Sequence, residues 1–289
     1  MRRILLSIAI FSFFLSLGAV CHKLGDYDPP GDAISVTVVG ATAYVADDVA
    51  GLQIIDISNP QSPVLLGSYN TSGSSRSVTV VGTTAYVTSG YAGLQIIDVA
   101  NPQSPVLLSS YTTPDEAYSV TVVGTTAYVT SGYAGLQIID VANPQSPVLL
   151  SSYTTPDKAY SVTVVGTTAY VADGGAGLQI IDISNPQNPV LLGSCDTPSE
   201  AYSVTMVGQT AYVGDAYAGL QIIDVANPQS PALLSSYDTP GHAFSVAVAG
   251  TTAYVADRHS GLQIIDVANP LSPALLSSYD TPGHAFSVA

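Results

Sequence analysis

The chain has 289 residues, of which 47% are hydrophobic and only 9% are charged. This composition supplies enough apolar material for a packed core and excludes an intrinsically disordered polymer. The formal net charge is −15, and because such a field repels nucleic acid and anionic lipid, we expect no nucleic-acid partner.

Residues 1–21 have the layout of a secretory signal peptide. Two arginines precede the apolar run Ile4–Val20, and this order of charge and apolar residues is typical of export signals. The run lies at the lower edge of the length of a bilayer span, and no basic stop-transfer segment follows it, so we expect export with cleavage. No later apolar stretch is long enough to span a membrane. We therefore expect residues 22–289 at the cell surface, in the periplasm or outside the cell.

Cys21 stands where a bacterial lipoprotein carries its acylated cysteine. The stretch "LGAVC" resembles a lipobox imperfectly, because Val20 fills a position that is normally small and Leu17 lies one place too far back. Ala19 and Cys21 serve equally well as the small residues of an ordinary cleavage site, so lipid anchoring at Cys21 and free secretion both stay open. The other cysteine is Cys195, and two cysteines predict no disulfide framework.

The rest of the chain repeats with a strict period of 42 residues. The motif "GLQIID" begins at six positions: Gly51, Gly93, Gly135, Gly177, Gly219 and Gly261. A fixed period of this length indicates a repeat architecture. Within the period 119–160, the runs "SVTVVG", "TTAYVTS", "GLQIIDVA" and "PVLLSSY" are separated by Gly or Asn-Pro, which predicts four strands. Abundant β-branched residues, recurrent proline and the lack of a helical apolar stripe disfavour helices.

Four short antiparallel strands in every unit predict an all-β fold, a β-propeller of four-stranded blades. We expect one propeller domain over 22–289 with six complete units and a partial one: 35–76, 77–118, 119–160, 161–202, 203–244, 245–286 and 287–289. The two ends compete for one place, because Tyr27 and Tyr279 lie six periods apart. Either the tail is displaced from a six-bladed ring, or the protein continues with more blades.

The repeat motif itself suggests a family. The stretch "LQIIDVANP" (Leu94 to Pro102) and its copies resemble the LVIVD repeat of bacterial and archaeal surface proteins, and "TAYVAD" before "GLQIID" resembles the second and third strands of NHL-type propeller blades. The resemblance covers residues 24–289, with all six copies of the core motif intact. It implies a propeller at or beyond the cell surface, and it implies no activity.

Comparison of the six copies separates an invariant framework from variable loops. An aspartate ends the third strand of every unit and is followed by Asn-Pro: Asp56, Asp98, Asp140, Asp182, Asp224 and Asp266. We expect these residues to satisfy backbone N–H groups at a turn rather than to bind a metal. The tyrosine of "TAYV" is expected to pack between blades. Cys195 replaces a tyrosine of the other copies, so we interpret it as a packing residue rather than a nucleophile.

The copies differ mainly in the turns between the second and third strands and in the crossovers between units. Antiparallel geometry places both on one face of the disc, where a rigid scaffold presents binding residues. We predict a ligand-binding face there, formed by Asp47, Asp48, Tyr91, Tyr133, Asp173, Asp215, Tyr217, Asp257 and His259 of the turns and by Glu116, Lys158, Glu200 and His242 of the crossovers. Drift of tolerant loops after recent duplication is the alternative interpretation.

Two kinds of metal site could be built on this face. The oxygen-rich turns suit calcium, but Ser89 and Ser131 replace the aspartate in two units and no EF-hand-like spacing occurs. His242, His259 and His284 suit zinc or copper, although surface histidines in duplicated loops are usually solvated. We expect no cofactor, with calcium as the alternative.

Taken together, the patterns predict a monomeric, exported and non-enzymatic propeller that binds a protein, a peptide or a glycan. The alternative is an architectural segment of a longer cell-surface protein. A hydrolase or lyase is disfavoured, because catalysis needs unlike groups held together and near-identical blades supply like groups related by symmetry. No GxSxG or HExxH motif occurs.

Overall fold

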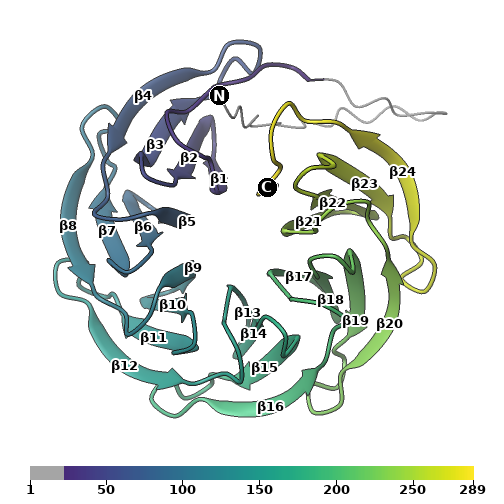
Figure 1. Cartoon of the computed structure of the whole chain (residues 1–289). Helices are drawn as coiled ribbons and strands as arrows, with labels where there is room; N and C mark the ends of the chain where they lie inside the picture. The colour runs from purple at the N-terminus through teal and green to yellow at the C-terminus, as the bar shows by residue number, and fades with distance from the viewer. Residues whose placement is uncertain (1–22) are drawn as a thin grey trace.

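The computed structural model describes residues 23–289 as an all-β propeller of six four-stranded antiparallel blades around a central axis (Figure 1). The predicted fold class is confirmed. No helix in this part of the chain is long and apolar enough to cross a membrane. The predicted signal peptide and Cys21 lie outside the described residues.

Each blade is a meander whose strands pair in chain order, with the first strand nearest the axis. The first blade comprises β1 (Ser35–Val39), β2 (Thr42–Asp47), β3 (Gly51–Asp56) and β4 (Val64–Tyr69). The second comprises β5 (Ser75–Val81), β6 (Thr84–Ser89), β7 (Leu94–Asp98) and β8 (Val106–Tyr111), and the third β9 (Ala117–Val123), β10 (Thr126–Ser131), β11 (Leu136–Asp140) and β12 (Val148–Tyr153).

The other three blades follow the same plan. They comprise β13 (Ser161–Val165), β14 (Thr168–Ala172), β15 (Leu178–Asp182) and β16 (Val190–Cys195); β17 (Ser203–Val207), β18 (Thr210–Gly214), β19 (Leu220–Asp224) and β20 (Ala232–Tyr237); and β21 (Ser245–Ala249), β22 (Thr252–Ala256), β23 (Leu262–Asp266) and β24 (Ala274–Tyr279).

The core lies between neighbouring blades. Large side chains on one face of the first blade, among them Tyr44 and Leu52, pack against smaller ones on the second, such as Ala85 and Val87. The same arrangement recurs at the next four junctions along the chain. Blades therefore stack by size complementarity, and the predicted role of the "TAYV" tyrosine in this packing is confirmed.

Threonines near the axis join successive blades by hydrogen bonds. The Thr37 hydroxyl donates to the backbone carbonyl of Val78 in the next blade over 2.6 Å. Four copies make the equivalent bond from Thr79, Thr121, Thr163 and Thr205. Each such bond contributes about 1 kcal/mol to stability, so the inner strands are held by polar as well as apolar contacts.

The invariant aspartates and asparagines close the turn between the third and fourth strands. The Ser58 N–H donates to Asp56 Oδ1 over 2.8 Å, and the Gln61 N–H donates to Asn59 Oδ1 over 3.2 Å. All six units make both bonds. The backbone hydrogen bond lowers the pKa of Asp56. The predicted structural role of this ring of carboxylates is confirmed.

The turn between the second and third strands of each blade requires a residue with a left-handed backbone, and in three blades this residue is not glycine: Asp48, Ala216 and Arg258. Asp48 adopts φ 34°, whereas its copy Gly90 adopts φ 52°. A side chain in this region costs about 1–2 kcal/mol, although aspartate tolerates it better than most residues. The turn geometry thus overrides the local preference of the residue in the first blade.

Exchange of these two residues tests that strain. Asp48→Gly should stabilise the protein by about 0.5–1 kcal/mol, because it relieves the left-handed backbone and removes a negative charge beside Asp47. The reciprocal Gly90→Asp should destabilise it by a similar or larger amount. Urea unfolding of both variants measures this, and shifts of the same sign would contradict the assignment.

Candidate binding site at the mouth of the central channel

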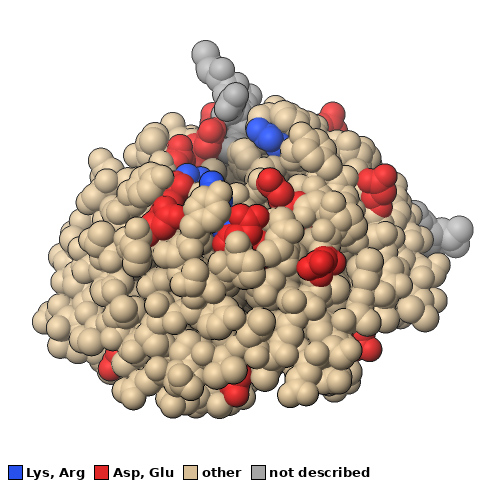
Figure 2. Space-filling model, turned by 60° about the horizontal axis from the view of Figure 1, so that its bottom comes forward, with Lys and Arg blue, Asp and Glu red and all other residues tan. Residues whose placement is uncertain are grey.

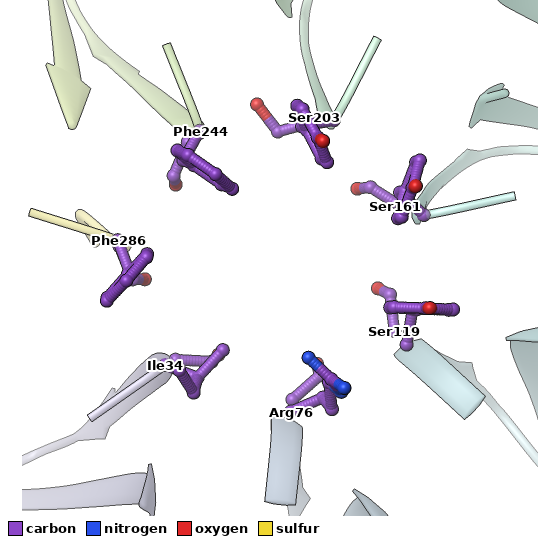
Figure 3. Close-up of a pocket in the computed structure, with 14 residues that line it drawn as sticks. Ile34, Arg76, Ser119, Ser161, Ser203, Phe244 and Phe286 are labelled. Atoms are coloured by element: carbon purple, nitrogen blue, oxygen red, sulfur yellow. The ribbon is translucent and has the colours of Figure 1, made fainter. Parts of the chain in front are cut away.

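The first strands surround a cavity of about 400 Å³ on the axis (Figure 3). Seven structurally equivalent residues, one period apart, line it: Ile34, Arg76, Tyr118, Tyr160, Tyr202, Phe244 and Phe286. Each is followed by a serine that also lines the cavity. Because these positions open the innermost strand of each unit, the repeat brings them together around the axis. A cavity of this volume is within the range of small-ligand sites.

Aromatic rings form a continuous wall along five of the seven equivalent positions of the channel. The ring centroids of Tyr118 and Tyr160 lie 5.0 Å apart, those of Tyr160 and Tyr202 4.6 Å, and those of Tyr202 and Phe244 4.7 Å. Phe286 continues the series 5.5 Å from Phe244. These separations are typical of aromatic pairs that stabilise one another, so the wall is preorganised.

Hydrogen bonds to two glutamates orient the tyrosines. The Tyr118 hydroxyl donates to Glu116 over 2.6 Å, and the Tyr202 hydroxyl donates to Glu200 over 2.7 Å. Arg76 forms an ion pair with Glu116 and lies 5.1 Å from the centre of the Tyr118 ring. Burial, followed by the bond to the glutamate, raises the pKa of both tyrosines above the ordinary 10.0. Both hydroxyls therefore stay protonated at neutral pH.

The turns and crossovers meet on the face where this channel opens, as predicted. Backbone bridges join each turn to the following crossover, for example Gly90 to Ala117 and Gly132 to Ala159. Three predicted tyrosines are prominent there: Tyr91, Tyr133 and Tyr217 are 73%, 60% and 72% exposed. These side chains are therefore available to a partner without any rearrangement of the fold.

Crossover residues lie against the exposed tyrosines. Lys158 Nζ stands 5.0 Å from the centre of the Tyr133 ring, and the rings of Tyr217 and His242 are 3.5 Å apart. Burial, followed by the charge of Arg258, lowers the pKa of His242 below its ordinary 6.5, so this imidazole is neutral at pH 7. Two pairs of the predicted residues, Tyr133 with Lys158 and Tyr217 with His242, thus contact one another at the mouth.

Basic side chains gather at this mouth although the chain is strongly acidic. Apart from Lys23, the basic residues of the described chain are Arg76, Lys158 and Arg258, and all three contact an aromatic ring of the channel or its rim. Figure 2 shows blue and red side chains beside one another, while most of the remaining visible surface is tan. The mouth is a mixed-charge aromatic surface rather than an acidic one.

Four of the predicted aspartates face inward instead. Asp47, Asp173, Asp215 and Asp257 are 0% exposed, and each accepts a backbone N–H bond from the segment that leads into its own blade, which for the last three is the preceding crossover. In the fifth blade, Asp215 also accepts a bond from the Thr197 hydroxyl over 2.7 Å. These carboxylates tie turn to crossover and do not present oxygens on the surface, whereas Asp48 is partly exposed.

The histidines do not converge into a metal site in the part of the chain that the structure describes. His259 lies 4.2 Å from His284, ring centre to ring centre, while His242 contacts Tyr217. Across residues 23–289, no three His, Cys, Asp or Glu side chains are grouped so as to hold an ion. Cys195 packs with Leu192 and Met206 against the core between two blades, and burial raises the pKa of its thiol.

Sequence comparison of the copies did not single out the channel-lining residues. In chain order, the seven copies carry Ile, Arg, Tyr, Tyr, Tyr, Phe and Phe at this position. The position is therefore as variable as the loop positions. Its place directly before the invariant serine at the start of the innermost strand was the available signal, since that end of each blade must approach the axis.

Comparison with known proteins places the fold and the family. Solved structures of similar architecture include a computationally designed protein, Ika8 (TM-score 0.68, 11% identity, covering 92% of this chain and 79% of that one). A functionally unknown protein from Desulfotomaculum acetoxidans DSM 771 has a TM-score of 0.71 at 13% identity, with 91% and 92% of the two chains covered. The β-propeller domain of Cps50 (Swd1) from Myceliophteria thermophila has 0.68 at 14%, with 88% of each chain covered.

These likenesses, all at low identity, define the class: the protein is a β-propeller. The model of the LVIVD repeat matches residues 30–71, 72–113, 115–155, 156–197, 198–239 and 240–281. The chain therefore belongs to the LVIVD repeat family, as its motif suggested. A search of curated proteins gave no match.

Replacement of a buried aspartate distinguishes a structural tie from a ligand. Asp215→Ala should destabilise the protein by about 1–3 kcal/mol, because the Ser199 N–H loses its acceptor. Asp215→Ser should cost less, since Ser131 already accepts the equivalent N–H of Asp115 in the third blade over 3.1 Å. Equal losses in the two variants, measured by urea unfolding, would contradict this role.

The pH dependence of stability in wild type and in Asp215→Ser gives a second check. Burial raises the folded-state pKa of Asp215 above its ordinary 3.8, so the folded protein binds more protons than the unfolded chain in the pH window above 3.8. The free energy of folding that proton binding by Asp215 contributes is fully present at low pH and is lost as the pH rises through the folded-state pKa. Wild type should therefore gain stability relative to Asp215→Ser between pH 7 and pH 4. Parallel pH profiles would contradict the assignment.

Proposed function

We propose that this protein is an exported, non-enzymatic propeller that binds a protein, a peptide or a glycan at the mouth of its central channel. The observation that carries the proposal is the aromatic wall of the channel, which opens onto a rim of exposed tyrosines. Aromatic faces beside hydroxyl groups and a few charges suit both the C–H faces of sugars and the side chains of peptides.

Several features support binding at this mouth. The channel is lined by side chains whose identity changes from blade to blade, on a framework that does not change. Tyr118 and Tyr202 are held in place by Glu116 and Glu200, so little side-chain entropy is lost when a ligand docks. Large exposed tyrosines are enriched where proteins recognise partners.

A non-enzymatic role fits the way the titratable groups are engaged. Glu116 is held by Arg76 and Tyr118, and Glu200 is held by Tyr202. The buried aspartates bond to backbone N–H groups. These carboxylates therefore position tyrosine side chains and loop backbone. Acid-base catalysis instead needs a pair of carboxylates with separated pKa values facing a substrate. The export part of the proposal rests on the sequence of residues 1–21, and lipid anchoring at Cys21 on the same stretch.

Thermal unfolding with a panel of envelope oligosaccharides and peptides tests the binding role. A ligand present at about 100 times its Kd should add roughly 2.7 kcal/mol and raise Tm visibly. Tyr133→Val and Tyr160→Ile should each lower the affinity for that ligand by about tenfold or more, because both remove an aromatic contact. Their equivalents Val49 and Ile34 show that the scaffold accepts these residues.

The matched control lies on the opposite face of the disc. Leu271 is 65% exposed in the turn between β23 and β24, where every other unit carries glutamine. Leu271→Gln should therefore leave affinity unchanged. A panel without any shift in Tm, or equal affinity in the two tyrosine variants and the control, would remove the proposal.

A further inference from the structure

The three histidines of residues 23–289 gather with an arginine on one side of the channel mouth. His242 and His284 each precede a phenylalanine of the channel wall by two residues. His259 lies beside His284, with ring centres 4.2 Å apart, and Arg258 lies 5.6 Å from the centre of the Phe244 ring. We call these four side chains, Arg258, His242, His259 and His284, the basic patch.

The tail of the chain completes the basic patch. Arg258 and Ala285 exchange two backbone hydrogen bonds of 3.0 and 2.9 Å, and Phe286 stands beside Phe244 at the cavity (Figure 3). The tail is thus docked in the ring and is not displaced from it. The rings of His284 and Phe286 are 5.7 Å apart, so His284 is held at the rim next to the channel wall.

Arg258 has no carboxylate partner in this part of the chain. The ion pairs between described residues join Lys23 to Asp26 and Arg76 to Glu116. Within residues 23–289, Arg258 forms no ion pair, and its Nε is buried without a hydrogen-bond partner. Its guanidinium lies over a ring instead. Because no described carboxylate neutralises it, its positive charge is available to an anionic ligand.

The carboxylates near the basic patch are engaged in other contacts. Asp257 is 0% exposed and accepts two hydrogen bonds, one of them from the Thr239 hydroxyl over 2.7 Å. Glu200 accepts the Tyr202 hydroxyl. Asp238 is close enough to Asp257 to raise the pKa of that carboxyl, although burial is the largest cause. These acids therefore do not cover the basic patch with negative charge.

The positive charge of the patch increases as the pH falls. Histidine is the side chain whose charge ordinarily changes between about pH 5 and pH 8. Burial, followed by Arg258 and His259, lowers the pKa of His242, while Asp257 and Glu200 oppose this. Protonation thus adds to a patch of groups that repel one another. An anion bound there relieves the repulsion, so its affinity must rise as the histidines become protonated.

We propose that the basic patch binds the carboxylates of an acidic glycan at the channel mouth, more tightly at acidic than at alkaline pH. This inference rests on the binding role proposed above and names the chemistry of the ligand. Ser245 and Ser287 line the cavity together with Phe244 and Phe286. Hydroxyl groups both donate and accept, as sugar hydroxyls require, and aromatic rings cover the C–H faces of sugars.

The acidity of the whole chain does not prevent such binding. The formal net charge is −15, but at physiological ionic strength exposed charges more than about 8 Å apart are largely screened. The groups within that distance of a ligand decide its affinity. At the basic patch they are one arginine and three histidines, whereas Lys158 lies elsewhere on the rim, against Tyr133.

Calorimetry with a linear tetramer of galacturonic acid at about pH 5.5 and pH 8 tests the proposal. The carboxylates of this probe stay ionised at both pH values. We expect the affinity to be about fivefold or more higher at the lower pH. The same tetramer with methyl-esterified carboxyls is the matched control ligand, and its affinity should be lower and should not rise with acidity.

The copies of the repeat supply variants that the fold accepts. Arg258→Gly should lower the affinity for the acidic tetramer by about tenfold at both pH values. It should not unfold the protein, because Arg258 has φ 43° and its copy Gly174 has φ 50°. His242→Lys introduces the residue of the equivalent Lys158. It should raise the affinity at pH 8 and so narrow the difference between the two pH values.

The outcomes separate this inference from the binding role itself. Failure of the acidic tetramer to bind at pH 5.5, equal affinity of its esterified form, or an unchanged affinity in Arg258→Gly would overturn the acidic-glycan proposal. Tight binding of an oligoglutamate peptide without binding of the tetramer would also overturn it. The binding role would still stand if that peptide, or a neutral member of the ligand panel, raised Tm.

The variant Leu271→Gln, on the opposite face, is the matched control protein. It should bind the acidic tetramer as wild type does at both pH values. A loss of affinity in this variant as large as in Arg258→Gly would place the acidic ligand away from the basic patch and would contradict the assignment.

Discussion

The packing of one blade against the next is the interaction on which the rest of the structure depends. Each sheet is apolar on both faces, with Tyr, Leu and Ile on one and Ala, Val and Ile on the other, so no blade can bury its surface alone. Stability in such an array is a sum of units and nearest-neighbour interfaces. The invariant residues serve that interface or the turns that set its geometry, as Asp56 and Asn59 do.

Because the invariant residues serve the interfaces and their turns, the residues around the axis and on one face of the disc can vary. The start of the innermost strand can hold Ile34, Arg76 or Tyr118 because the residue lines the channel rather than the interface between blades. The buried aspartates, by contrast, lie in the same variable turns but bond to crossover backbone. Turn stability and recognition are therefore carried by neighbouring positions of one loop, where Asp215 is buried and Tyr217 is exposed.

Much of the fold follows from the sequence because the signal is repeated six times. Alternating β-branched residues and Asn-Pro turns specify strands locally, and the constant period requires every unit to be alike. The burial of Asp173 and Asp215 could not be read from sequence, because a loop aspartate looks the same whether it points to solvent or to a crossover N–H. The channel wall was missed for a related reason: periodicity shows which residues are equivalent, but not how far each lies from the axis.

The number of positions around the ring also could not be predicted from the sequence. It depends on the small rotation between successive blades, which is set by the combined sizes of the packed side chains and is not encoded at any single residue. With Phe286 between Phe244 and Ile34, that rotation leaves one sector between the first and last blades. Among the described residues, the two complete blades beside this sector then have one full interface each instead of two.

Hydrogen exchange of the isolated protein, followed by mass spectrometry, tests nearest-neighbour packing most directly, because local opening tracks local burial. The account predicts that amides of β10, β11, β14 and β15, which lie in blades packed on both sides, exchange slowest, and that those of β22 and β23 exchange about tenfold or more faster. Equal protection of all six blades would contradict it, because the sixth blade would then be as well supported as those with two complete neighbours.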